Sequence, residues 1–464
     1  MRKIITVLGI LLIPLFTSFA QSSLPIAWGN ADKSHGIIFT SIGNISILKY
    51  SSSKMSIIDE KGDVQKLPWQ WPAGWRLLDA IDHNDEYIIL IINNLNLSNY
   101  TGTVEIHKMR KDDYSLSEDF STIDEYTGSL TVDVHRNCKL KYSEDSTKIY
   151  LMFYNLDHVA RMCNIKHLVV DNQWDLLWTR SGYPTPEINN ASADLQIVTN
   201  DGEVYYTFIG YVKNPNTKKN EMVYHIMGVN NEGDPIYSFR LPTQIVQINV
   251  NLKPMGDGVV LLSGFLRERY RDDALFVSYL IDLNDNTIVG SSKEKFALDT
   301  RKDFIGESKP MLERWNYGSW FGRYYTFENE TIQVLHFLGY GDAASYIIMH
   351  MNENGEITSC QFLNNPETSK QFVQRDGFLH FLYIDNIKNY TSKKIIDSGK
   401  NAKKQCLTYI KYNIKAQTIE KQMIEKLADL KATEGEVVAC RDDGFLVVIK
   451  KGGKYYYGAV AYAE

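Results

Sequence analysis

One polar turn motif recurs seven times along this chain, and each copy separates two runs rich in β-branched and aromatic residues. Asn, Asp and Gly tolerate the backbone conformations of tight turns, so a turn between two such runs predicts an antiparallel hairpin. The first residues of successive copies stand 51 to 68 positions apart, which indicates a repeated structural unit. The copies are residues 59–63, 110–113, 171–175, 230–234, 284–286, 352–355 and 413–416.

A second hairpin precedes each copy and often has its own Asp/Gly turn, as at 200–202. The clearest repeat therefore predicts four strands, and four antiparallel strands are the layout of a propeller blade. These strands are expected at residues 195–199, 203–212, 221–229 and 235–241.

The two ends of the repeat array are incomplete in complementary ways. The C-terminal part predicts three strands, at 436–440, 445–450 and 454–463, while residues 24–28 form a short apolar run without a neighbour. Joining them makes one more sheet and closes the ring, which removes its open edges. We therefore expect an all-β chain, a β-propeller of about eight four-stranded blades. Seven blades is the alternative if the short first unit, 36–69, belongs to the closure, and a tandem of β-sandwiches fits the regular period less well.

In strand number, period and turn chemistry, the chain resembles secreted β-propellers of the kelch-like and NHL-like kind over nearly its whole length. It lacks the Ser-x-Asp-x-Gly boxes of sialidases and the Trp-Asp signature of another large propeller group. The resemblance implies a fold and transfers no functional residues, because one fold hosts many activities.

The N-terminus has the pattern of a secretory signal peptide. Arg2 and Lys3 precede an apolar run that ends at Phe16, and a Ser-Phe-Ala sequence completes the cleavage site. We expect residues 1–20 to be removed and 21–464 to form a single propeller domain that is secreted or periplasmic.

Charge and hydropathy narrow the range of partners. The formal net charge is −6, and −8 once Arg2 and Lys3 are removed, which argues against general affinity for nucleic acid. No later segment approaches the roughly 18 consecutive apolar residues of a membrane span. The first cysteine is Cys138, too far along the chain for a lipid anchor at the signal peptide. The oligomeric state is not determined by these features.

No metal or cofactor site is predicted. The five cysteines are odd in number, and most lie in apolar stretches, so buried inert thiols are expected. His158, Cys163 and His167 form a compact group whose spacing suits no standard zinc site. Residues 282–286 imitate a calcium loop but lack its glycine and its final glutamate, so they predict a turn.

Basic loops suggest where a ligand binds. The turns between strands three and four of each blade are tight, whereas the connections between strands two and three are expected to be longer and to share the opposite face. Binding residues concentrate on loops of rigid scaffolds, so a glycan or an acidic protein is expected there. The alternative is that these charges are merely solvated. The basic loop residues are Lys213, Lys218, Lys219, Arg267, Arg269, Arg271, Lys388, Lys393, Lys394, Lys400, Lys403 and Lys404.

Two aromatic clusters in the connections between blades add to this prediction. The first contains Trp69, Trp71 and Trp75, and the second contains Trp315 and Trp320. Exposed rings stack on sugar faces, so these residues are candidate ligand contacts together with the three loop arginines. The competing interpretation is that they pack between neighbouring blades.

An enzyme is the second hypothesis, although no standard catalytic motif is present. A polysaccharide lyase needs a base beside a cation that neutralises a uronate carboxylate. A structural scaffold of the cell envelope is the third hypothesis. The candidate catalytic pairs are His158 with Arg161, Tyr270 with Arg267, Arg269 or Arg271, and His135 with Arg136.

Overall fold

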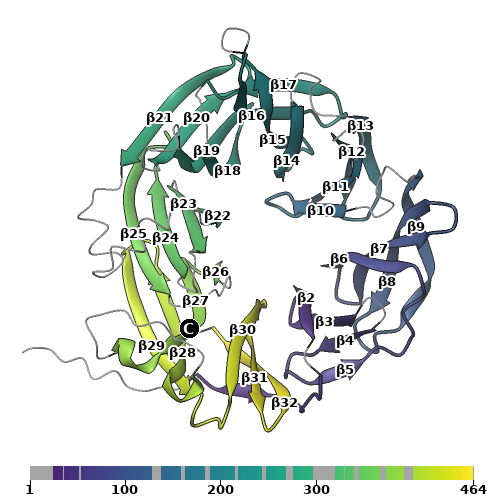
Figure 1. Ribbon diagram of the computed structural model, residues 1–464, viewed down its shortest axis with the longest axis vertical. Helices are drawn as coiled ribbons and strands as arrows, with labels where there is room; N and C mark the ends of the chain where they lie inside the picture. The colour runs from purple at the N-terminus through teal and green to yellow at the C-terminus, as the bar shows by residue number, and fades with distance from the viewer. Residues whose placement is uncertain are drawn as a thin grey trace, which may run out of the picture.

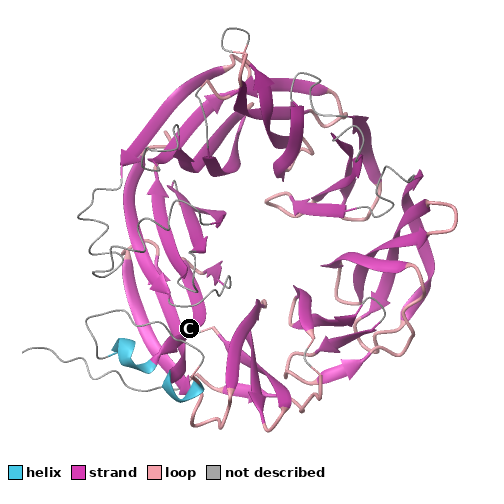
Figure 2. Cartoon of the chain, viewed as in Figure 1, coloured by secondary structure: helices cyan, strands magenta, loops and turns pink. Residues whose placement is uncertain are grey.

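The protein forms a ring of eight four-stranded antiparallel sheets around a central axis (Figure 1). Strands account for almost all of the regular structure, with two short 3-10 helices as the exception among the described residues (Figure 2). The computed structural model describes residues 24–34, 36–51, 54–127, 137–157, 162–182, 189–214, 218–242, 247–267, 275–295, 319–328, 330–338, 344–365, 372–390 and 401–462.

Seven sheets are built from four consecutive strands each, and these are blades one to seven. Blade one contains β2 (Ile37–Ile42), β3 (Ile45–Ser51), β4 (Lys54–Ile58) and β5 (Val64–Lys66). Blade two contains β6 (Trp75–Asp82), β7 (Tyr87–Asn96), β8 (Thr101–Arg110) and β9 (Leu116–Thr127). Blade three contains β10 (Asn137–Tyr142), β11 (Lys148–Asp157), β12 (Met162–Asp171) and β13 (Leu176–Gly182). Blade four contains β14 (Asn189–Val198), β15 (Val204–Lys213), β16 (Asn220–Val229) and β17 (Pro235–Arg240).

The remaining three blades follow the same order. Blade five contains β18 (Gln247–Gly256), β19 (Val259–Arg267), β20 (Leu275–Asp282) and β21 (Thr287–Lys295). Blade six contains β22 (Ser319–Phe327), β23 (Glu330–Leu338), β24 (Ala344–Met351) and β25 (Ile357–Asn365). Blade seven contains β26 (Phe372–Arg375), β27 (Phe378–Asn386), β28 (Gln405–Asn413) and β29 (Thr418–Lys426), with η2 (Ile387–Tyr390) and η3 (Ala402–Lys404) between its second and third strands.

The eighth sheet joins the two ends of the chain. Its order is β1 (Ile26–Trp28), β32 (Lys454–Ala461), β31 (Gly444–Lys451) and β30 (Glu434–Cys440), so the first strand completes a sheet made by the last three. The backbone N–H of Gly29 extends this pairing by donating to the carbonyl of Tyr457 at 2.9 Å. Arg441, which is buried, donates to the carbonyl of Asp59 and so ties this closing blade to blade one. The predicted closure and the count of eight blades are confirmed.

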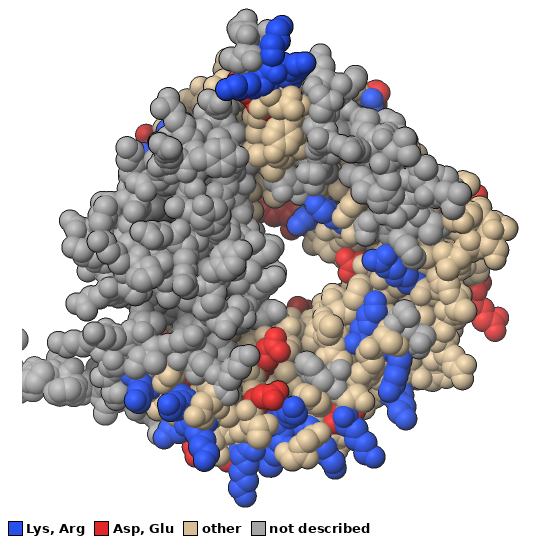
Figure 3. Space-filling view, viewed as in Figure 1, with Lys and Arg blue, Asp and Glu red and all other residues tan. Residues whose placement is uncertain are grey.

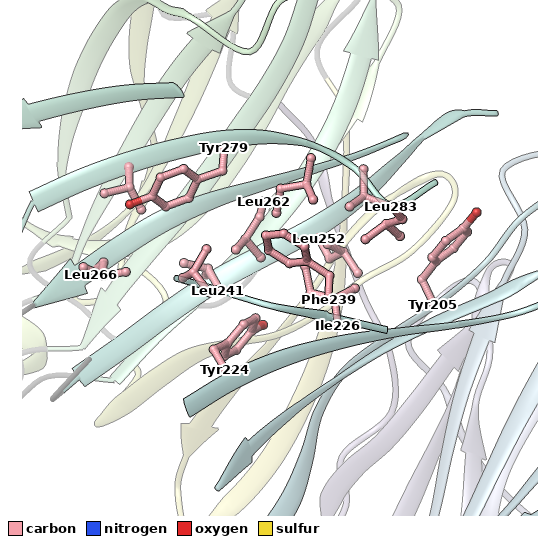
Figure 4. Packing of buried hydrophobic residues seen from close by; sticks show 14 residues of the cluster. Tyr205, Tyr224, Ile226, Phe239, Leu241, Leu252, Leu262, Leu266, Tyr279 and Leu283 are labelled. Atoms are coloured by element: carbon pink, nitrogen blue, oxygen red, sulfur yellow. The ribbon is translucent and has the colours of Figure 1, made fainter. Parts of the chain in front are cut away.

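The core lies between neighbouring blades rather than within any one of them. Side chains alternate across each pleated strand, so the inner strands bury both faces against the adjacent sheets. Figure 4 shows one such layer, in which Tyr224 and Phe239 of blade four meet Leu252, Leu262 and Tyr279 of blade five. Full burial of a side chain such as Leu262 contributes about 1.5 to 3 kcal/mol. A single blade has no core of its own, so ring closure matters for the whole fold.

The tight turns between strands three and four share one hydrogen-bond pattern. In four of them the side-chain oxygen of the first residue accepts N–H groups from the residues two and four positions later. The fourth position has a positive φ, between 73° and 90°, which explains its glycines. Those four turns begin at Asp59, Asp171, Asn230 and Asn352.

Candidate binding face

Strand direction assigns every connection to one of two faces. Because adjacent strands are antiparallel, the turns between strands one and two and between three and four share a face, here called the tight-turn face. The connections between strands two and three and those between blades share the other, here called the long-loop face. In blade seven the connection on that face runs from Asn386 to Gln405 and contains η2 and η3. In blade one and the closing blade it consists of only two residues, so the predicted difference in length between the faces is partial.

One arc of the long-loop face is rich in lysine. It covers blade seven, the closing blade and blade one, and in Figure 3 blue side chains gather along this lower arc of the ring. The described part of the arc has ten exposed lysines, whereas its exposed acidic residues are Asp429, Glu434 and Glu436. Glu434 already pairs with Lys450 at 3.3 Å. We call the ten exposed residues the lysine sector: Lys33, Lys54, Lys66, Lys388, Lys403, Lys404, Lys426, Lys431, Lys451 and Lys454.

The lysine sector is a local reversal of the charge of the whole protein, which is −6. Its members come from strand ends and connections of three successive blades, so they form an extended array rather than one pocket. Lys54 lies over the ring of Tyr50, 4.8 Å from the centroid, which holds its aliphatic stem against the surface. The arrangement suits an extended anionic ligand.

Trp69, Trp71 and Trp75 cluster where the connection from blade one enters blade two. The rings of Trp69 and Trp71 stack with centroids 5.3 Å apart, and Trp71 meets Trp75 edge-on at 5.7 Å. The Trp69 indole donates to the carbonyl of Tyr114 and the Trp71 indole to the carbonyl of Trp75. All three side chains are half-buried and pack against the core between blades one and two. They serve packing and keep part of their surface accessible, and a ligand role for them stays a prediction.

The central channel is lined by the innermost strands and encloses a cavity of about 1210 Å³. Asp79, Asp82, His83 and Tyr142 lie in its wall. Burial raises the pKa of the Asp79 carboxyl, while burial and the charges of Asp79 and Asp82 raise the pKa of the Tyr142 phenol. Burial, with the charge of Lys108, lowers the pKa of His83. The Tyr142 phenol is therefore protonated at neutral pH, and the described wall of the channel also contains Lys139 and Lys141.

Several predicted site residues fall outside the described part of the chain. They are His135, Arg136, His158, Arg161, Arg269, Tyr270, Arg271 and Trp315. Arg267 ends β19 and Trp320 lies in β22, but their side chains are not among those described. The backbone of Arg267 is at the long-loop face, because strand two of each blade runs toward that face. Its role as a ligand contact stays a prediction.

The described residues contain no group of three or more His, Cys, Asp or Glu side chains that suits a metal ion. His167 is buried, and its Nδ1 is 2.6 Å from the hydroxyl of Tyr150. It is therefore a packed core residue. The thiols of Cys138, Cys406 and Cys440 are half-buried or buried, and burial raises the pKa of the Cys406 thiol to about 11. No helix among these residues is long and apolar enough to cross a membrane.

Most of the lysine sector was not predicted from the sequence. Lys33, Lys54 and Lys66 stand singly in the sequence, whereas Lys451 and Lys454 belong with Lys450 to a short basic group around a two-residue turn. Their common location follows only from the strand order, which brings the ends of separate hairpins to one face. The sum of the charges at the strand ends of each predicted blade would have indicated these lysines.

By its sheet order, the chain is an eight-bladed β-propeller. No family model and no curated protein matches it. Solved structures match it distantly. An acylaminoacyl peptidase of Pyrococcus horikoshii is 11% identical over 81% of this chain, with a TM-score of 0.36, and the chain spans 49% of that peptidase. An apocarotenoid oxygenase mutant of Synechocystis is 8% identical, over 71% of this chain and 74% of its own, with a TM-score of 0.37. A subtype N10 neuraminidase-like protein of A/little yellow-shouldered bat/Guatemala/060/2010 is 9% identical, over 71% and 94%, with a TM-score of 0.30.

Proposed function

We propose that this protein is an exported binding module that holds an acidic polysaccharide on its long-loop face. The observation that supports this proposal is the lysine sector, with ten exposed lysines and three exposed acidic residues on a protein of net charge −6. Such a concentration of one charge attracts ligands of the opposite charge and speeds their encounter.

The shape of the sector favours a linear polymer over a compact ligand. Single exposed ion pairs contribute about 0 to 1 kcal/mol each, so a small anion that meets one lysine gains little. A polyanion that crosses three blades meets several lysines at once, and linked weak contacts add up to useful affinity. Arg267 ends β19 at the same face, and the predicted basic loop that it begins, with Arg269 and Arg271, is a further candidate contact for the polymer.

The lyase hypothesis receives less support from the described residues. A lyase requires an unprotonated base beside a cation, and the residues named for that role, among them His158, Arg161 and Tyr270, lie outside the described part of the chain. The scaffold hypothesis explains the packed Trp69, Trp71 and Trp75 but gives no reason for the lysine sector. Binding is therefore the function that we propose.

Titration with polygalacturonate at low salt tests the proposal. The variant Lys54→Ser/Lys451→Ser/Lys454→Ser removes three charges from the lysine sector and should bind about tenfold more weakly, which corresponds to about 0.5 kcal/mol per charge. Affinity of the unmodified protein should fall as salt rises, because exposed charges are screened over ~8 Å at physiological ionic strength.

A matched control removes three exposed lysines near the tight-turn face, as Lys61→Ser/Lys108→Ser/Lys415→Ser. The control should bind polygalacturonate as the unmodified protein does. Equal losses in the two triple variants would show that total charge alone governs binding and would contradict a site in the lysine sector. Replacement of Arg267, Arg269 and Arg271 by Ala should weaken binding further while the thermal midpoint stays unchanged.

A further inference from the structure

Blade two has a second concave site at its long-loop end, separate from the lysine sector. The pocket has a volume of about 1010 Å³ and is formed where the connection into β6 meets the ends of β7, β8 and β9. Its polar lining includes Asn94, Thr103, Glu125 and Thr127, and the described lining contains no lysine or arginine. Leu97, 62% exposed, lies at its edge. A pocket of this size with a few convergent polar groups is typical of a small-molecule or oligosaccharide site.

A buried hydrogen-bond network fixes two polar side chains of this pocket, Asn94 and Thr103. Asn94 and Thr103 both donate to one carboxylate oxygen of Glu105, at 2.9 Å and 2.6 Å, and the Nε2 of His107 lies 2.9 Å from the other oxygen. Burial works to raise the pKa of Glu105, but the hydrogen bonds from Thr103, His107 and Asn94 outweigh it, so this pKa is lowered. A single bond from the Asn94 amide sets its orientation and leaves further donor and acceptor capacity. The orientation of these two side chains is therefore fixed before a ligand binds.

Two aromatic side chains lie beside the walls of the same pocket. The ring of Tyr126 lies directly against Gly102, since a Cβ atom on that glycine would sit 2.5 Å from it, and both residues line the pocket. Trp75 flanks the wall formed by residues 73 and 74, and its ring centroid is 4.5 Å from that of His107. The hydrogen-bond network and the tryptophan cluster are therefore one continuous assembly. Both rings support the wall from behind, because Tyr126 is buried and Trp75 is half-buried, and the exposed apolar side chain at the pocket edge is Leu97.

We infer that this pocket binds a neutral saccharide unit. The absence of basic groups from the described lining, together with the exposed carboxylate of Glu125, disfavours an anionic ligand. A neutral sugar offers hydroxyl groups that both donate and accept, which the amide, hydroxyl and carboxylate groups here can satisfy. Concavity favours this ligand over a flat protein surface. The inference does not rest on the lysine sector.

Calorimetric titration with a panel of neutral oligosaccharides tests the inference, with cellotetraose, xylotetraose and mannotetraose as first probes. At least one neutral oligosaccharide should bind, and its affinity should change less than about twofold between low and high salt because no ion pair forms. The variant Glu125→Ala/Thr127→Ala removes two exposed lining groups from the end of β9 and should weaken binding about tenfold or more, as expected for two lost hydrogen bonds.

The matched control is Glu118→Ala/Thr122→Ala, which changes the same residue types on the same edge strand, exposed but outside the pocket lining. It should bind as the unmodified protein does. If no neutral oligosaccharide binds, or if both double variants bind equally, the inference is wrong. Polygalacturonate titrations of the same samples distinguish this failure from that of the proposed function, because the two tests use different residues and only polygalacturonate binding should depend on salt.

Discussion

The two faces of the ring differ in how regular their connections are, although the same strands lead into both. On the tight-turn face, one Asx-type turn recurs in blades one, three, four and six, with a side-chain oxygen accepting N–H groups from the residues two and four positions later. On the long-loop face, connections range from two residues in blade one to the segment between Asn386 and Gln405. The lysine sector and the blade-two pocket both belong to this variable face. The repeated face stabilises the scaffold, and the variable face is where we place binding.

The largest expected effect comes from opening the scaffold. Deletion of residues 22–30 removes β1 and leaves β32 as an open edge, so the free energy of unfolding should fall by several kcal/mol and aggregation should increase. Urea denaturation followed by tryptophan fluorescence measures the change. An unchanged midpoint would mean that the ring does not depend on this closure.

Acid should weaken the scaffold over a defined range of pH. Burial lowers the pKa of both His167 and His380 to about 4, so each is neutral when folded and gains a proton on unfolding below about pH 6.5. Stability is therefore complete above pH 6.5 and falls as the pH drops toward 4, by about 3 kcal/mol per histidine as an order of magnitude. Urea midpoints at pH 7.5, 5.5 and 4.5 measure this loss.

The variant His167→Gln isolates the contribution of one histidine to this acid sensitivity. Its midpoint should be lower at pH 7.5, because the contact with Tyr150 is lost, but should fall less steeply with acid than that of the unmodified protein. A parallel fall in both proteins would assign the acid sensitivity to other groups.

Two glycines, one on each face, allow the cost of an alanine substitution to be compared between the faces. Gly62, in a tight turn, has φ of +88°, and a Cβ there would lie 2.4 Å from the carbonyl oxygen of Tyr457. Gly452, in the two-residue turn of the closing blade on the long-loop face, has φ of +57° and open space around it. Gly62→Ala should cost about 2 to 4 kcal/mol, and Gly452→Ala about 1 kcal/mol, because only the first adds a clash to the backbone strain. Equal costs in thermal denaturation would contradict this difference between the faces.

The sequence was sufficient to predict the repeated elements of the fold. The turns at Asp59, Asp171 and Asn230 carry their own local chemistry, so seven hairpins, the strand order and the closure by the residues around Trp28 followed from pattern alone. Strand boundaries in blade four differ from those predicted by a few residues, mainly because β14 begins at Asn189 and not at Leu195.

The candidate sites depend on contacts that no sequence window contains. The period-two spacing of Thr103, Glu105 and His107 places them on one face of a strand, but the contact of Glu105 with Asn94 of the neighbouring strand follows only from the strand pairing. The lysine sector likewise collects residues that are far apart in the sequence from three blades. Runs of charge, such as the loop with Arg267, are visible in the sequence, whereas convergence across strands appears only once the blades are arranged in space.

The claim that function resides on the variable face is tested most directly by hydrogen exchange measured by mass spectrometry with and without polygalacturonate. The account predicts slower amide exchange in peptides that cover the β3–β4 turn, the β31–β32 turn and η3, all of which lie in the lysine sector. Exchange in the tight turns at 59–63 and 230–234 should not change. Protection confined to those tight turns, with none in the lysine sector, would contradict the account.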